Sequence, residues 1–92
     1  MTTIHHAPKD LAESLQALEA VTLPADLLTP LGDVLRSLDS AQDADEVNTF
    51  LAEAGGITLG LQLAKGVSRE QAKHLNAIFE ALASHVRRVL VN

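Results

Sequence analysis

Hydrophobic residues recur along this chain at the spacing of an α-helix, in four stretches separated by prolines, glycines and short polar segments. In the first stretch, Leu11, Leu15 and Leu18 fall at i, i+4 and i+7 and therefore line one face of a helix. The pattern predicts an all-α domain, a small four-helix arrangement with a C-terminal antiparallel helical hairpin. The expected helices span about 9–21, 30–41, 44–65 and 68–91, in a single domain over 8–92 that follows a disordered tail over 1–7.

The start of the second helix has two interpretations, because prolines stand at two places before its apolar stripe. In the first, Thr29 is the N-cap and Pro30 occupies the first helical position, where a missing N–H leaves no hydrogen bond unmade. In the second, the helix begins at Pro24 and Pro30 lies inside it. We favour the first, because an interior proline costs about 3 kcal/mol and the residue before a proline is pushed away from the helical region.

A double glycine at 55–56 makes the third stretch ambiguous. Residues 57–63 alternate as a strand would, but no second β-rich segment exists to pair with them. The helical period also continues through the glycines, so we predict one helix over 44–65 that bends, if anywhere, at the glycines. Small residues recur along it every four positions and form a groove that lets another helix approach closely, which offsets the cost of about 1 kcal/mol per glycine. These helix-packing residues are Ala52, Gly56, Gly60 and Ala64.

The last stretch has the strongest amphipathic pattern in the chain. Ser68 and Gln71 have the spacing of a capping box, and Gly66 suits the position just after the preceding helix. The connection between the last two helices is short, which is why they are expected to form an antiparallel hairpin with the first two helices laid against it.

Composition narrows the range of functions. Leu, Val, Ile and Phe make up 28 of the 92 residues, enough for a hydrophobic core. The absence of cysteine excludes disulfide scaffolds, thiol nucleophiles and cysteine-based metal sites, and two phenylalanines offer almost no surface for stacking bases. The N-terminal segment lacks the pattern of a signal peptide and no apolar run approaches the ~20 residues of a membrane span, so we expect a cytoplasmic protein without membrane contact.

Candidate chemical residues do not form a recognisable site. His74 and His85 stand eleven residues apart, about 16 Å along a helix, which is too far to share a metal ion within one chain. The acids between 39 and 46 are explained by helix capping. We therefore predict no catalytic, cofactor-binding or metal-binding residues, no cofactor and no enzymatic activity.

Charge is unevenly distributed along the chain. Residues 1–64 carry ten acidic and two basic residues, whereas residues 65–92 carry five basic and two acidic residues, within a net charge of −5. A nucleic-acid-associated regulator that uses the basic C-terminal helix is therefore an alternative function, although an acidic chain repels nucleic acid overall. The residues it would use are Arg69, Lys73, Arg87 and Arg88.

A protein–protein interaction module is the function that the sequence favours. A 92-residue chain without disulfides buries a limited fraction of its surface, and a second copy or another protein partner would add to it. We expect a homodimer in which the long C-terminal helix pairs across a two-fold axis. The expected interface consists of Leu75, Phe79, Leu82, Val86 and Val89, with His74 and His85 at its rim.

Overall fold

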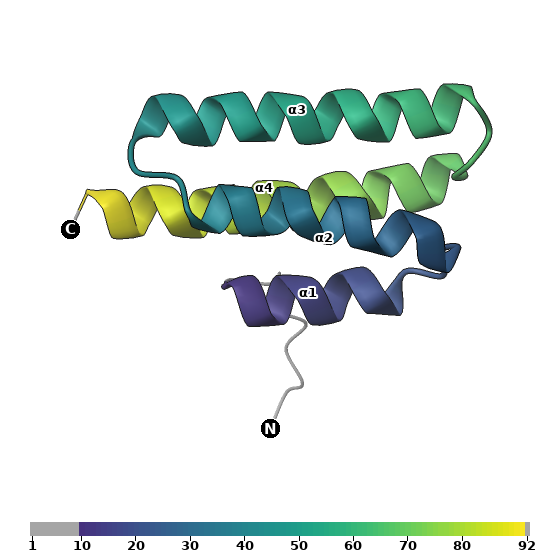
Figure 1. Cartoon of the computed structure of the whole chain (residues 1–92), viewed down its shortest axis with the longest axis horizontal. Coiled ribbons are helices and arrows are strands. Elements are labelled where there is room, and N and C mark those ends of the chain that lie inside the picture. The colour runs from purple at the N-terminus through teal and green to yellow at the C-terminus, as the bar shows by residue number, and fades with distance from the viewer. Residues whose placement is uncertain (1–9, 92) are drawn as a thin grey trace.

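The described part of the chain folds into four α-helices joined by short connections (Figure 1). The computed structural model describes residues 10–91, so the predicted tail over 1–7 lies outside the described part. Within that part there is no strand, and the prediction of an all-α arrangement is confirmed. The helices are α1 (Leu11–Ala20), α2 (Ala25–Asp39), α3 (Ala44–Leu63) and α4 (Arg69–Leu90).

Three of the four described helices begin at a side-chain cap. Asp10, Asp43 and Ser68 each accept a hydrogen bond from the backbone N–H three residues later, at 2.8, 2.8 and 3.0 Å. Each bond satisfies one of the N–H groups that a helix start leaves without a partner. These caps explain why the observed starts of α1, α3 and α4 lie close to the expected ones.

The start of α2 corrects the sequence interpretation. The helix begins at Ala25 with Pro24 as its N-cap, and Pro30 lies inside it rather than at its first position. Leu27 and Leu28, which precede Pro30, pack against the hydrophobic core. The apolar contact of these two leucines outweighs the hydrogen bond that the proline removes.

Helix α3 runs without interruption through the double glycine, as predicted. At its end, however, Lys65 rather than Gly66 takes the left-handed conformation, with a φ of 61°. The N–H groups of Lys65 and Gly66 bond back to the carbonyls of Gln62 and Leu61, at 3.0 and 2.8 Å. The turn into α4 therefore begins one residue earlier than the position of the glycine suggests.

The helices are arranged with two in the centre and two at the edges. Helices α2 and α4 contact each other, and each of them also contacts both α1 and α3. Helices α1 and α3 do not contact one another, and lie on opposite sides of the central pair (Figure 1). Each edge helix consequently has one face that points away from the other described helices.

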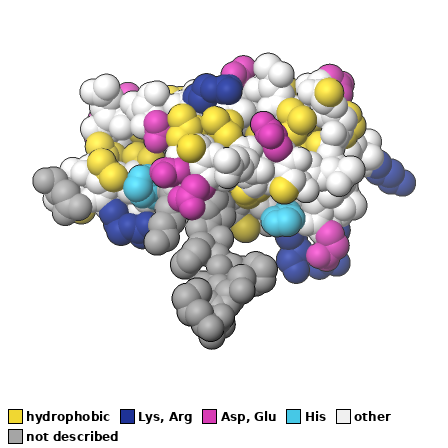
Figure 2. Space-filling view, turned by 90° about the horizontal axis from the view of Figure 1, so that it is seen from below, with side chains coloured by type: hydrophobic (Ala, Val, Ile, Leu, Met, Phe, Trp, Pro, Cys, Tyr) yellow, Lys and Arg dark blue, Asp and Glu magenta, His cyan; other side chains and the backbone are white. Residues whose placement is uncertain are grey.

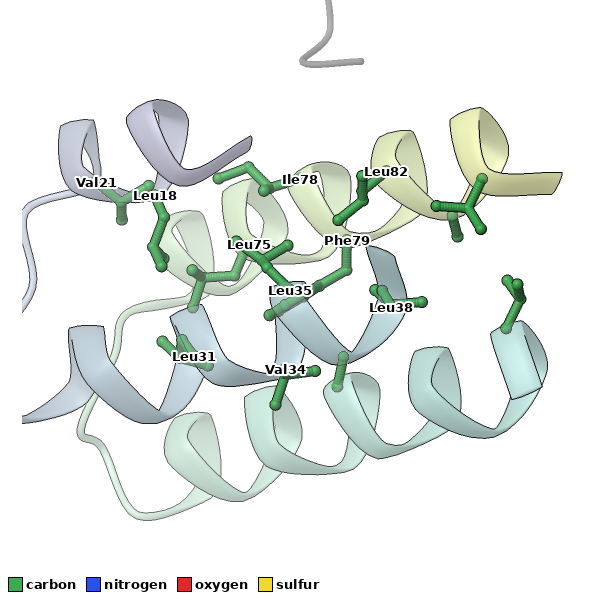
Figure 3. Close-up of a cluster of buried hydrophobic side chains, with 14 of the residues drawn as sticks. Leu18, Val21, Leu31, Val34, Leu35, Leu38, Leu75, Ile78, Phe79 and Leu82 are labelled. Carbon is green, nitrogen blue, oxygen red and sulfur yellow. The ribbon is translucent and has the colours of Figure 1, made fainter. Parts of the chain in front are cut away.

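The core fills the space between the central helices and is closed at its sides by the edge helices. Figure 3 shows leucines of α2 and apolar side chains of α4 meeting between the two helices, with Leu18 of α1 and Val21, which directly follows α1, beside them. Full burial of one such side chain contributes about 1.5–3 kcal/mol. The largest of these buried side chains are Phe79, Leu31, Leu35, Leu38, Leu75 and Leu82.

Candidate functional site: the outer face of α3

Most of the interface predicted on α4 is buried inside the chain itself. Leu75, Phe79, Leu82 and Val86 lie in the core, at most 5% exposed. Helix α4 is a central helix, so its apolar arc faces the other three helices and is not available to a second copy. Only Val89, at the end of the helix, remains exposed. The predicted dimer interface on α4 is therefore wrong for these four residues, which are buried within the single chain.

The two histidines of α4 stay apart. His74 is exposed and His85 is half-buried, and their helical positions place them about 16 Å apart along α4. On the face that Figure 2 presents, the histidine side chains do not gather at one place. Among residues 10–91, no group of three or more histidine or acidic side chains has the arrangement needed to hold a metal ion.

The basic residues of α4 are likewise divided between its two ends. Arg69 and Lys73 lie on the first turns, and Arg87 and Arg88 lie on the last, about 27 Å further along the axis. Arg87 is half-buried and donates a hydrogen bond to Oδ1 of Asn48 at 2.8 Å, which joins α4 to α3. The structure therefore does not bring these four residues into one basic patch.

A hollow of about 430 Å³ lies between α1 and α2. It is lined by Gly32 and three leucines, Leu15, Leu18 and Leu28, and by the polar residues Glu19, Thr29 and Arg36. A Cβ added at Gly32 would contact the side chains of Leu15 and Arg36. Arg36 also pairs with Asp33 at 3.1 Å, and both side chains are more than half exposed. The hollow therefore combines apolar side chains with a solvent-exposed ion pair between Arg36 and Asp33, an arrangement that does not indicate a catalytic or ligand-binding site.

The stripe of small residues on α3 faces solvent. Ala52, Gly56, Gly60 and Ala64 are all exposed, and a Cβ built on either glycine would meet no atom within 4 Å. None of the other described helices packs into the stripe, so the predicted close approach of another helix is not made by any helix within residues 10–91. The stripe lies on the outer side of an edge helix, away from the helices that pack against α3 in the described part of the chain.

Two exposed leucines extend this stripe into an apolar surface. Leu59 and Leu63 are 56% and 74% exposed. Together with Ala52 and Gly56 they stand at intervals of four, three and four residues, the spacing at which a helix presents one continuous line of residues to a partner helix. We call these four residues, Ala52, Gly56, Leu59 and Leu63, the α3 seam.

The α3 seam has no charge along most of its length. Residues 54–64 include no acidic or basic side chain, although about half of them are exposed. The nearest charged residues are Glu53 on one side of this segment and Lys65 on the other, and both are exposed. The seam is therefore an apolar strip with an acid toward one end and a base at the other.

The other edge helix provides an internal comparison. Helix α1 occupies the equivalent position on the opposite side of the central pair, but its exposed positions include Glu13, Gln16 and Glu19. Figure 2 is viewed from the side of α1 and shows acidic side chains on that face. Polar residues are the usual composition of a helix face in contact with water. The composition of the α3 seam is consequently a property of α3 rather than of edge helices in this fold.

A smaller apolar surface lies at the end of α4, where Val89, Leu90 and Val91 are exposed. A hollow of about 410 Å³ separates Leu90 and Val91 from the start of α3 at Asp43 and Ala44. No other described helix buries these three side chains at the end of α4.

Leu59 and Leu63 are absent from the interface predicted from the sequence. The signal that identifies them is the spacing of the α3 seam, which lies opposite the buried positions Val47, Ala54 and Thr58 on the same helix. A sequence with apolar residues on both sides of one helix does not state which side faces the core.

None of the helices in the described part combines the length and hydropathy needed to cross a bilayer. The chain matches no protein-family model, and no curated protein or solved structure is significantly similar to it.

Proposed function

We propose that this protein is a helical interaction domain, without catalytic activity of its own, that docks a partner helix on the α3 seam. One observation carries the proposal: an edge helix exposes Leu59 and Leu63 on an uncharged face, whereas the equivalent face of α1 is polar. Exposed apolar surface of this kind is typical of a binding site, because its burial releases water that it otherwise orders.

The glycines of α3 support the same proposal. Gly56 and Gly60 each cost about 1 kcal/mol of helix stability relative to alanine, and no close contact with another described helix compensates for that cost. A partner helix packed on the seam could approach more closely over glycine than over any larger residue. Leu59 and Leu63 would then supply the apolar contact, as in other grooves that bind a helix.

Site-specific photo-crosslinking tests the proposal. A photoreactive phenylalanine derivative placed at Gly60, beside the seam, should give a protein adduct of defined mass when intact cells are irradiated. The same amino acid at Gln16, on the outer face of α1, is the matched control and should give none. Adding Leu63→Glu to the Gly60 variant should abolish its adduct. If neither position forms an adduct, or both form the same one, the α3 seam is not a binding site.

A further inference from the structure

We infer that the occupant of the α3 seam is a second copy of this chain, with the two α3 helices packed antiparallel across a two-fold axis. The inference rests on the proposed function, since it names the partner for the same surface. It is carried by two features of the seam: the order of small and large residues along it, and the charges at its two ends.

The order of residues along the seam is complementary to its own reverse. From one end to the other the seam is small, small, large, large: Ala52, Gly56, Leu59 and Leu63. When two copies run antiparallel about a point between Gly56 and Leu59, each leucine of one copy faces a small residue of the other. Leu63 then lies over Ala52, and Leu59 lies over Gly56, at both ends of the contact. A parallel pair would instead set leucine against leucine and glycine against glycine, and would leave a gap at one end.

The charges at the ends favour the same orientation. Glu53 lies near the start of the seam and Lys65 lies just beyond its end, and both are exposed. In the antiparallel register, position 53 of one copy lies opposite position 62 of the other, about 5 Å along the axis from Lys65. Two opposite-charge pairs form by symmetry. A parallel pair would set Glu53 against Glu53 and Lys65 against Lys65, which is unfavourable.

The backbone allows the close approach that this register requires. Apart from the nearby backbone of α3 itself, no atom of the described residues lies within 4 Å of the position where a Cβ on Gly56 or Gly60 would stand, so the outer surface of the helix is open there. The contact is confined to one helix, about 30 Å long from its 20 residues. We therefore expect a dimer of moderate affinity that dissociates on dilution.

Sedimentation equilibrium on the full chain is the first test. The chain should show a monomer–dimer equilibrium, and Leu59→Glu or Leu63→Glu should raise the dissociation constant at least tenfold. Circular dichroism should show an unchanged fold in both variants, because both leucines are exposed in the single chain. Gln16→Glu adds the same charge to the other edge helix and should leave the dissociation constant unchanged. A dimer that tolerates both leucine substitutions overturns the inference.

Charge reversal tests the pairing of the ends. Glu53→Lys and Lys65→Glu should each weaken the dimer, by about threefold at low ionic strength, as is typical of exposed ion pairs. The double variant carries the reversed pair and should regain most of the lost affinity. Equal weakening in the double variant would overturn the proposed juxtaposition.

Disulfide trapping tests the orientation, and the absence of native cysteine makes it unambiguous. A mixture of Ala52→Cys and Leu63→Cys chains should form a mixed disulfide under mild oxidation, because positions 52 and 63 face each other across the antiparallel contact. Ala52→Cys alone should not crosslink, since its two copies lie about 16 Å apart along the axis. Rapid crosslinking of Ala52→Cys alone indicates a parallel pair and overturns the inference.

The two proposals can fail separately. A chain that stays monomeric up to millimolar concentration, while the Gly60 photoadduct forms with a different protein, overturns the second copy as partner and leaves the interaction domain in place. Monomeric behaviour without any adduct overturns both.

Discussion

The side-chain amide of Gln71 donates a hydrogen bond to the backbone carbonyl of Thr22, and so ties the start of α4 to the connection between α1 and α2. The same side chain accepts a bond from the N–H of Ser68 at 2.7 Å, while the N–H of Gln71 donates to the Ser68 hydroxyl at 3.0 Å. Gln71 therefore caps its own helix and holds a distant part of the chain. A capping box alone would accept glutamate at this position equally well.

We expect Gln71→Glu to lower the free energy of unfolding by about 1–2 kcal/mol. Glutamate keeps the acceptor for Ser68 but replaces the donor to Thr22 with a carboxylate oxygen that faces a carbonyl. Urea denaturation measures the change. Gln16→Glu, which makes the same chemical change at an exposed position of α1, should have little effect. A stabilised Gln71→Glu variant would show that helix capping alone governs this position.

Pro30→Ala should stabilise the protein by about 1–3 kcal/mol. Pro30 lies inside α2, where alanine would restore an N–H for the carbonyl of Asp26 and remove the clash of the ring with the preceding turn. Thermal or urea unfolding measures the gain. Pro24→Ala, at the N-cap, is the control and should bring no comparable gain. If Pro30→Ala instead lowers the free energy of unfolding, Pro30 occupies the first position of α2, as the first sequence interpretation expects.

Ser14→Ala should also be stabilising, by about 1 kcal/mol. The hydroxyl of Ser14 is buried without a hydrogen-bond partner within the described structure, so its removal takes away an unmet polar group and leaves a better helix former. The buried hydroxyl of Thr58 is the contrasting case, because it donates to the carbonyl of Ala54 at 2.9 Å. Denaturation should therefore show a smaller gain, or none, for Thr58→Val.

Phe79→Ala should cost about 3–5 kcal/mol of stability, the usual loss for a large side chain removed from a core. The loss should be the same at every protein concentration, since Phe79 packs within the chain. Val89→Ala, on the exposed end of α4, should change stability by only a few tenths of a kcal/mol. If Phe79→Ala leaves the free energy of unfolding unchanged but weakens dimerisation, the dimer interface lies on α4 instead.

Gly55→Ala and Gly56→Ala separate folding from binding. Neither added methyl group would meet an atom within 4 Å in the single chain, so each should raise stability by about 0.5–1 kcal/mol in dilute solution. Gly56 belongs to the α3 seam, whereas Gly55 lies to one side of it. Sedimentation should consequently show weaker association for Gly56→Ala and unchanged association for Gly55→Ala. Equal association of the two variants would contradict close packing over Gly56.

Local features of the fold can be predicted from the sequence. The caps at Asp10, Asp43 and Ser68 act on N–H groups within one turn, so the residues that make them are neighbours along the chain. The continuity of α3 through its glycines follows from two features of the sequence. The helical period continues across the glycines, and no second β-rich segment is present to pair with a strand at 57–63. The start of α2 cannot be predicted in this way, because Leu27 and Leu28 hold the turn before Pro30 in place through contacts with distant residues.

The candidate site depends on tertiary structure to a greater degree. The sequence is sufficient to predict that the chain is all-α and that α3 and α4 each carry apolar stripes, because helical period is a local property. Which stripe is buried depends on how the helices pack together. Helix α4 lies in the centre and its stripe becomes part of the core, whereas α3 lies at an edge and leaves Leu59 and Leu63 exposed to water. Burial is set by what packs against a helix, and the residues of that helix alone do not specify its neighbours.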